Sequence, residues 1–266
     1  MNIGSNFTQF NIAHAGNVLN TNLAKQMPGM KFDTFQKGLY TTSPRKTSVS
    51  SNSTIPINNL YSSKQLLNAY SNPSYVKFLI DTNPNVKNML SAYGVETKIY
   101  PENIKNITNS HLTTTTAFAL QIANKMGISQ ADKQILEQAC VFHDFGKILI
   151  PKEIIEKTSS LTDSEKQIMN LHSDLGYELL SSTGMNERVL NLIKNHHNPS
   201  NNTDILGQIL SVADIYSALR EERSYKKALS EKDALSILDQ KAQSGEVSTE
   251  VVNALKASLY TSVNAA

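Results

Sequence analysis

The sequence lacks the features that mark secreted, membrane-spanning or nucleic-acid-binding proteins. Its 266 residues include a single cysteine, Cys140, which cannot form an intramolecular disulfide. Residues 1–26 lack the continuous apolar core of a secretory signal peptide, and no run approaches the roughly 18 apolar residues of a membrane-spanning helix. A net charge of +2 is too small to favour binding to a phosphate backbone. We therefore expect a cytoplasmic protein without a membrane span or a long nucleic-acid partner.

The composition changes near residue 56. Asn, Ser and Thr dominate residues 1–56, and no helical or alternating pattern persists there. Such a segment buries too little apolar area to offset the entropy cost of ordering it. Five basic residues against one acidic residue give this tail a charge of +4, which leaves −2 for the rest. We interpret it as a low-complexity, disordered tail; a contact with a protein partner is the alternative.

Residues 57–104 predict a short helical lead-in. Pro73 and Pro84 each follow an asparagine and suit a first helical turn, whereas Gly94 suits a helix end. Apolar residues recur at three- and four-residue spacing over residues 75–90. Nothing in this segment identifies a chemical role.

Residues 105–262 predict consecutive amphipathic helices. Ser129, Thr162 and Ser230 suit N-cap positions, and Glu165 would complete a capping box with Thr162. Helix ends are expected at three glycines, Gly127, Gly146 and Gly184. Neither a strand pattern nor a repeat of roughly 20 to 50 residues is present. The sequence therefore predicts an all-α bundle.

Five of the six histidines lie between residues 111 and 197, and helical spacing directs them inward. His143 follows Leu136 and Cys140 on the apolar stripe of its helix. His111 shares a helix face with Phe118. Both side chains are expected to face the core.

The remaining candidates point the same way. His172 lies on an apolar stripe, and His196 and His197 follow Ile193 near the end of a helix beside the core. Asp214 lies within an almost unbroken apolar run. Each of these residues alone has a simpler explanation, because an inward histidine is more often a hydrogen-bonded core residue and a buried aspartate can cap a helix or pair with an arginine.

Together, the five imidazoles and the carboxylates of Asp144 and Asp214 are harder to explain as core residues. An uncompensated buried charge costs several kcal/mol, so these groups need a shared partner. Imidazole suits Mn, Fe, Co, Ni or Zn, and carboxylates can bridge two ions. The set therefore indicates a site for divalent metal.

The run His143-Asp-Phe-Gly-Lys-Ile-Leu-Ile-Pro151 resembles the HD superfamily of metal-dependent phosphohydrolases, and specifically its HD-GYP branch. In that branch a His-Asp-x-Gly-Lys run precedes an Ile-Pro segment, as it does here. Further matching runs follow in the same order: Leu161–Glu165, His172–Leu179, His196-His197, Val212–Leu219 and Arg223–Lys226. The resemblance covers about residues 105–260 and implies the helical bundle of an HD domain.

The resemblance also implies a binuclear metal centre. One ion would be bound by four residues, His111, His143, Asp144 and Asp214. Asp144 would bridge to a second ion, which His172, His196 and His197 complete. Iron or manganese is the expected metal, with nickel, cobalt or zinc as alternatives.

Further roles follow from the same resemblance. Lys147 would act in catalysis with Asp144, either on a phosphate oxygen or on the attacking water. Arg223 and Lys226 would bind another phosphate group, and a solvated basic side chain is the alternative for these cations. Glu102 could add a metal ligand, although an acid in a first helical turn is the simpler interpretation.

One departure from the branch concerns the substrate. Where the branch has Gly-Tyr-Pro after the histidine pair, this chain reads His197-Asn-Pro-Ser-Asn-Asn-Thr-Asp-Ile-Leu-Gly207. That loop helps to shape the pocket of the branch, so its loss leaves the substrate open. The metal ligands are retained, and hydrolysis is still expected.

The predicted reaction is hydrolysis of a phosphoester by a water activated between two metals, without a covalent enzyme intermediate. A cyclic dinucleotide such as cyclic di-GMP is the expected substrate. The alternatives are another nucleotide or phosphomonoester, and a catalytically silent signalling or binding module. Cys140 is a poor nucleophile candidate because apolar neighbours raise the pKa of a thiol.

Overall fold

The computed structural model describes residues 63–103, 110–198, 204–222 and 227–263. The tail predicted for residues 1–56 lies outside these ranges. The chain divides into two units, Met1–Ala69 and Tyr70–Ala266, and helix α3 (Ser63–Tyr70) ends at the boundary between them. The described candidate site residues all belong to the second unit.

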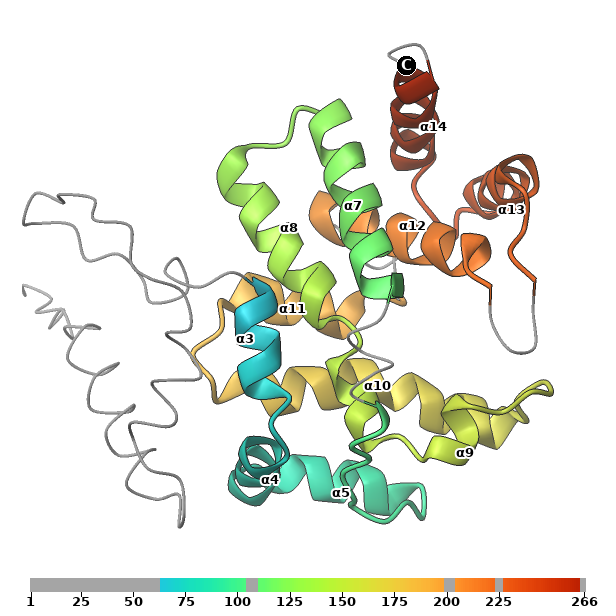
Figure 1. Cartoon of the computed structure of the whole chain (residues 1–266). Helices are drawn as coiled ribbons and strands as arrows, with labels where there is room; N and C mark the ends of the chain where they lie inside the picture. Colours follow the sequence, from blue (N-terminus) through green and yellow to red (C-terminus); the bar gives the residue numbers. More distant parts are fainter. Residues whose placement is uncertain (1–62, 104–109, 199–203, 223–226, 264–266) are drawn as a thin grey trace, which may run out of the picture. The chain divides into compact units, whose positions relative to one another are not determined.

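The second unit is helical, and no β-strand occurs in its described residues (Figure 1). In chain order its elements are α4 (Pro73–Thr82), α5 (Pro84–Ala92), α7 (Ser110–Lys125), α8 (Gln130–Phe142), the 3-10 helix η2 (Phe145–Leu149), α9 (Lys152–Ile155), α10 (Asp163–Ser181), α11 (Glu187–Asn195), α12 (Ile205–Arg220), α13 (Glu231–Gln243) and α14 (Thr249–Val263). The predicted all-α fold is confirmed. Across the described ranges, no helix has the length and apolar character needed to cross a membrane.

The helix boundaries follow from local capping chemistry. The Asn72 side chain accepts hydrogen bonds from the first turn of α4, and Pro73 opens that helix, as predicted. Thr162 and Glu165 form a reciprocal capping box at the start of α10. Gly127 follows α7 with a φ of +70°, a conformation that glycine adopts without strain. Short sequence signals therefore set where these helices begin and end.

Two long helices organise the packing of the unit. Helix α10 packs against η2, α11, α5 and α4, and helix α12 packs against α7, α8 and α13 (Figure 1). Helices α7 and α8 form an antiparallel pair, and α8 also contacts α11. The core between them contains the fully buried side chains of Leu136, Leu175, Ile193, Ile209 and Val212. This apolar burial fixes the helices that carry the candidate ligands.

Gly146 does not end a helix, contrary to the sequence prediction. It lies inside η2, and its φ is not positive. A Cβ atom at this position would lie 2.1 Å from the backbone oxygen of His172 and 2.7 Å from the backbone nitrogen of Gly176. Glycine is therefore required because the backbones of η2 and α10 touch. This close approach brings Asp144, which precedes η2, against α10.

Part of the lead-in is tied to η2. The backbone N–H of Tyr100 donates to the Ile148 oxygen at 2.9 Å. The side-chain amide of Asn103 donates to the Lys147 oxygen at 2.8 Å and to the Ile150 oxygen at 2.9 Å. These bonds satisfy carbonyls at the end of a helix and hold the turn that carries Lys147.

Candidate metal centre

The predicted metal ligands come from five helices that meet inside the unit. His111 lies in the first turn of α7, His143 caps the end of α8, and Asp144 precedes η2. The other ligands are carried by α10, α11 and α12: His172 on α10, His196 and His197 just after α11, and Asp214 on α12. Residues up to 103 positions apart in the sequence thus become neighbours.

The first cluster contains two histidines and two carboxylates. Ligand atoms of His111, His143 and Asp144 all lie within 4.8 Å of one another. Asp214 Oδ1 lies 2.9 Å from His111 Nε2 and 3.6 Å from His143 Nε2. His111, His143 and Asp144 are buried, and the Asp214 side chain is 13% exposed. The four residues predicted to share one ion are therefore brought together.

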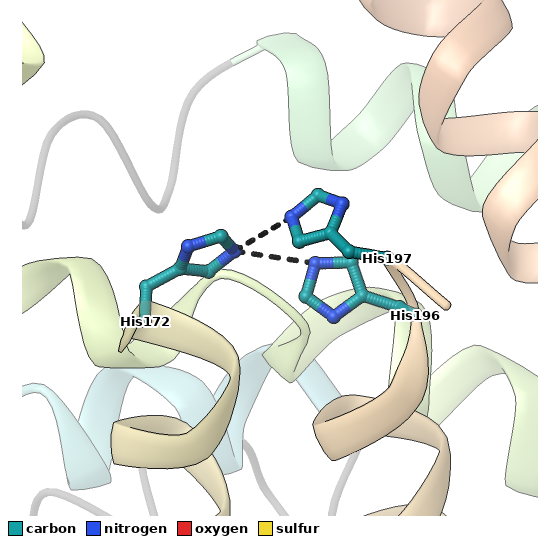
Figure 2. A group of neighbouring side chains, drawn as sticks. All are labelled: His172, His196 and His197. Atoms are coloured by element: carbon teal, nitrogen blue, oxygen red, sulfur yellow. Dashed lines mark hydrogen bonds between the residues drawn. The ribbon is translucent and has the colours of Figure 1, made fainter. Parts of the chain in front are cut away.

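The second cluster contains three histidines (Figure 2). His172 Nε2 lies 3.2 Å from His196 Nε2 and 3.0 Å from His197 Nε2. His172 and His196 are buried, whereas His197 is exposed. Figure 2 shows the rings of His196 and His197 turned toward the ring of His172.

Asp144 lies between the two clusters. Its Oδ2 atom is 3.4 Å from His143 Nε2, and its Oδ1 atom is 3.4 Å from His172 Nε2. The carboxylate thus presents one oxygen to each group of histidines. The rings of His143 and His196 also approach, with 5.2 Å between their centroids. A single carboxylate therefore connects two adjacent ligand sets.

Three of the histidine rings are oriented by their own helices. In each, Nδ1 lies 2.6 to 2.7 Å from the backbone oxygen three residues earlier. The pairs are His143 with Cys140, His172 with Met169, and His196 with Ile193. A carbonyl oxygen only accepts hydrogen bonds, so Nδ1 must carry the proton in each neutral ring. This arrangement leaves Nε2 as a free acceptor.

The free acceptors explain why the site suits a cation. The Nε2 atom of His143 is buried without a hydrogen-bond partner among the described residues. The Nε2 atoms of His172 and His196 face each other, and two acceptors cannot share a hydrogen bond without an added proton. Oriented imidazole nitrogens beside carboxylates are the donor set that transition metals bind. The clusters can therefore hold divalent metal.

Burial keeps the second cluster neutral. Burial, reinforced by the nearby Lys147 charge, lowers the pKa of His172 to about 3. Burial and the neighbouring His197 hold the pKa of His196 well below its usual range. Neutral imidazole is the form that binds a metal. These rings are therefore available as ligands at neutral pH.

The first cluster attracts positive charge. Burial by itself lowers the pKa of His143, but Asp144 and Asp214 outweigh it and raise this pKa to about 9. Burial disfavours the charged form of Asp144, yet Lys147 and His143 hold its pKa well below the usual range. A proton on His143 thus occupies a position between carboxylates where a metal cation would also be stabilised.

Comparison with known families identifies this arrangement. The model of the HD domain family matches residues 108–219, which include all seven predicted ligands. These residues form an HD domain.

Curated relatives of the chain include phosphodiesterases. The chain is 33% identical over 132 residues to the cyclic di-GMP phosphodiesterase response regulator RpfG of Xanthomonas campestris, a match that covers 44% of this chain and 34% of the relative. It is 27% identical over 134 residues to 3'3'-cGAMP-specific phosphodiesterase 2 of Vibrio cholerae, covering 45% of this chain and 25% of the relative. The matched segment thus spans about a third or less of the length of these relatives.

A solved structure also resembles the chain. Bd1817, described as an HDG"Y"P protein from Bdellovibrio bacteriovorus, is 16% identical and aligns with a TM-score of 0.49. The alignment covers 96% of this chain and 75% of Bd1817.

The remaining predicted site residues have different outcomes. Lys147 lies beside the HD-domain clusters, with Nζ 2.7 Å from Asp144 Oδ2 and a side chain that is 22% exposed. Arg223 and Lys226 lie outside the described residues, so their predicted phosphate contacts stay predictions. Glu102 is exposed and belongs to neither ligand cluster found in the described ranges.

Two polar residues beside His111 were missed by the sequence interpretation. Ser217 Oγ lies 3.1 Å from His111 Nδ1, and Glu221 Oε2 lies 3.6 Å from the same nitrogen. Both residues stand on or just after α12, three and seven positions beyond Asp214. Helical spacing from Asp214 was the signal that could have found them.

Proposed function

We propose that the HD domain is a metal-dependent phosphodiesterase that hydrolyses a cyclic dinucleotide such as cyclic di-GMP. The observation that carries this proposal is Asp144, whose two oxygens face two separate sets of histidine nitrogens. The relatives, whose names specify cyclic di-GMP and 3'3'-cGAMP, support the substrate class.

The proposed metal ligands form two sets that share Asp144. The first set is His111, His143, Asp144 and Asp214, and the second is Asp144, His172, His196 and His197. Iron or manganese is the proposed metal. Divalent ions held there would act as Lewis acids toward a phosphoryl oxygen. They would also lower the pKa of a bound water to near neutrality.

The side chains around these ligands have different proposed roles. Buried carboxylates and neutral imidazoles hold the donor atoms in place before a substrate arrives. Lys147 reaches from Asp144 toward solvent, where its ammonium group can contact a phosphate oxygen. His197 is the exposed member of the second cluster, so the substrate is proposed to enter beside it. Arg223 and Lys226 are proposed to hold the second phosphate of a dinucleotide.

The proposal extends to the organisation of the chain. Residues 105–262 form the proposed catalytic domain, and residues 57–104 form its lead-in. The tail is proposed as a region that can contact a protein partner. Cytoplasmic placement is part of the proposal, because Cys140 is a free, buried thiol and contributes no disulfide.

A second candidate substrate follows from the sequence between His197 and Gly207, which lacks the Gly-Tyr-Pro tripeptide of the resembling branch. A changed loop would alter the pocket without removing the ligands. Another nucleotide or a phosphomonoester is therefore the alternative substrate for the same chemistry.

Metal analysis and a substrate panel test the proposal. Protein purified without chelator and reconstituted with Mn²⁺ or Fe²⁺ is expected to hold close to two ions per chain. The loaded protein is then incubated with cyclic di-GMP, 3'3'-cGAMP, linear dinucleotides, nucleoside monophosphates and an artificial phosphodiester. Cleavage of a cyclic dinucleotide supports the proposal. Cleavage of monophosphates alone favours the alternative, and no metal or turnover points to a silent binding module.

Asp144→Asn tests the assignment of the site itself. Removing the shared carboxylate charge is expected to lower metal content and abolish turnover, because both ligand sets lose a donor. Asp163→Asn is the matched control, since Asp163 is an almost fully exposed acid at the start of α10. Full activity in Asp144→Asn would show that the site lies elsewhere.

A further inference from the structure

His111 differs from the other buried histidines in how its ring is held. His143, His172 and His196 each use the backbone carbonyl three residues earlier. His111 is the second described residue of α7, and the residue three positions before it lies outside the described ranges. Its Nδ1 atom instead meets polar groups contributed by the α12 region.

Ser217 is the closest of these groups. Its side chain is buried, and its Oγ atom lies 3.1 Å from His111 Nδ1 and 3.4 Å from the His111 backbone oxygen. A hydroxyl can donate one hydrogen bond while it accepts another. Donation to the carbonyl leaves the Oγ lone pairs facing Nδ1, so they can accept a hydrogen bond from Nδ1 when that nitrogen carries the proton. The carboxylate of Glu221, 3.6 Å from Nδ1, favours the same protonated nitrogen.

The other nitrogen of His111 faces the metal centre. His111 Nε2 lies 2.9 Å from Asp214 Oδ1. Asp214 and Ser217 are three positions apart on α12, so one face of this helix contacts both edges of the same ring. When the proton stays on Nδ1, Nε2 and Oδ1 are two acceptors directed at one point, as a metal requires.

We propose that Ser217 is a positioning residue that prepares His111 for metal binding. Its hydroxyl holds the Nδ1 proton and fixes the ring plane, so that Nε2 is free for the ion of the first cluster. This role rests on the proposed function, because it requires that the first cluster binds metal. It adds to that cluster a residue that does not itself contact the ion.

Zinc affinity is the first measurement. The full-length protein is stripped of metal, and Zn²⁺ binding is measured by competition with a chromophoric chelator. Ser217→Ala is expected to weaken one of two zinc equivalents by about 10- to 100-fold, the usual effect of losing a group that orients a ligand. Ser217→Thr keeps the hydroxyl and is expected to retain affinity, whereas the equally large Ser217→Val is expected to lose it. If Ser217→Ala fails to fold, the comparison of Ser217→Thr with Ser217→Val tests whether the hydroxyl is required for zinc affinity.

A spectroscopic readout separates orientation from general damage. In the zinc-loaded, ¹⁵N-histidine-labelled protein, the His111 Nδ1 proton is expected to exchange slowly with water in the wild type and in Ser217→Thr. It is expected to exchange rapidly or disappear in Ser217→Ala and Ser217→Val. Thr115→Val is the matched control, because Thr115 lies one turn after His111 with a buried hydroxyl that has no hydrogen-bond partner among the described residues.

The outcomes separate this inference from the proposed function. If the wild type binds no zinc, the metal centre and the role of Ser217 both fail. If the wild type binds zinc and Ser217→Val matches Ser217→Thr in affinity and proton exchange, only the role of Ser217 is overturned. Selective loss in Ser217→Val, with Thr115→Val unchanged, supports it.

Discussion

Lys147 Nζ lies 2.7 Å from Asp144 Oδ2, so a lysine is paired with the carboxylate that the two histidine clusters share. The lysine lies three residues beyond the aspartate, so the pair spans the first turn of η2. Asp144 is buried, whereas Lys147 retains contact with solvent. The pair therefore links the buried interior of the site to solvent.

Replacing Lys147 should separate catalysis from metal binding. Lys147→Met removes the ammonium group but none of the proposed metal ligands. We expect metal content near the wild-type value and a fall in kcat of about 10²-fold or more, the usual range for losing a donor that stabilises transition-state charge. Steady-state kinetics with elemental analysis measures both effects. Wild-type kcat in this variant would exclude Lys147 from catalysis.

The metal-free form of the same variant should be less stable. Without Lys147, Asp144 loses its closest cation while it remains buried. Breaking a buried ion pair by removing one partner costs about 3 to 5 kcal/mol, and partial exposure of the lysine places this pair near the lower limit. Urea unfolding in excess chelator provides the measurement, and Lys147→Arg serves as the charge-conserving control.

Gly146→Ala should disrupt the packing of η2 on α10. The added Cβ would lie 2.1 Å from the His172 oxygen, and both neighbouring atoms are backbone, which cannot move aside as a side chain can. Adding a methylene to a well-packed core costs about 1 to 3 kcal/mol of stability, and we expect Gly146→Ala to lose more than this. Gly127→Ala is the comparison, because its Cβ would meet no atom within 4 Å and only the left-handed backbone is strained. Chemical denaturation of both variants tests the difference; equal losses would contradict the close contact.

The Thr162–Glu165 capping box should make stability depend on pH in the acid range. A hydrogen bond from Lys157, together with the Thr162 backbone N–H, lowers the pKa of Glu165 from 4.5 to about 2. A carboxyl group with a lowered folded-state pKa contributes stability that is complete above pH 4.5 and is lost as the pH falls toward 2. The difference in unfolding free energy between wild type and Glu165→Gln is therefore expected to shrink across this interval.

This measurement is made on metal-free protein in chelator, so that release of metal at low pH does not contribute. Lys157→Met should reduce the pH-dependent part of the stability that Glu165 contributes, because it removes the largest cause of the lowered Glu165 pKa. A wild-type advantage over Glu165→Gln that stays constant from pH 6 to pH 2.5 would contradict the lowered pKa.

Much of the fold could be predicted because helix boundaries depend on neighbouring residues. Asn72 with Pro73, and Thr162 with Glu165, act within one turn, and the structure shows them where the sequence placed them. The inward direction of His143 also follows from spacing along one helix. The fold class and the burial of this histidine were therefore available before the structure.

Contacts between helices could not be predicted from the sequence in the same way. Gly146 resembles a helix end in the sequence, but its role depends on the backbone of α10 passing within contact distance. Ser217 is one of several polar residues in α12, and only the position of α7 shows that its hydroxyl meets His111. A single sequence fixes the faces of the helices, whereas their relative placement depends on packing.

The orientation of His172 and His196 by their own helices has a consequence for how the unit unfolds. The two rings are held by backbone carbonyls in the metal-free chain, so binding a metal would add little ordering cost. The residues that would hold the ion belong to α10, the end of α11 and the turn at Asp144. Such an ion would act as a cross-link between segments far apart in the chain. We expect the midpoint of thermal unfolding to rise with free metal concentration, because the folded state alone presents the assembled ligands.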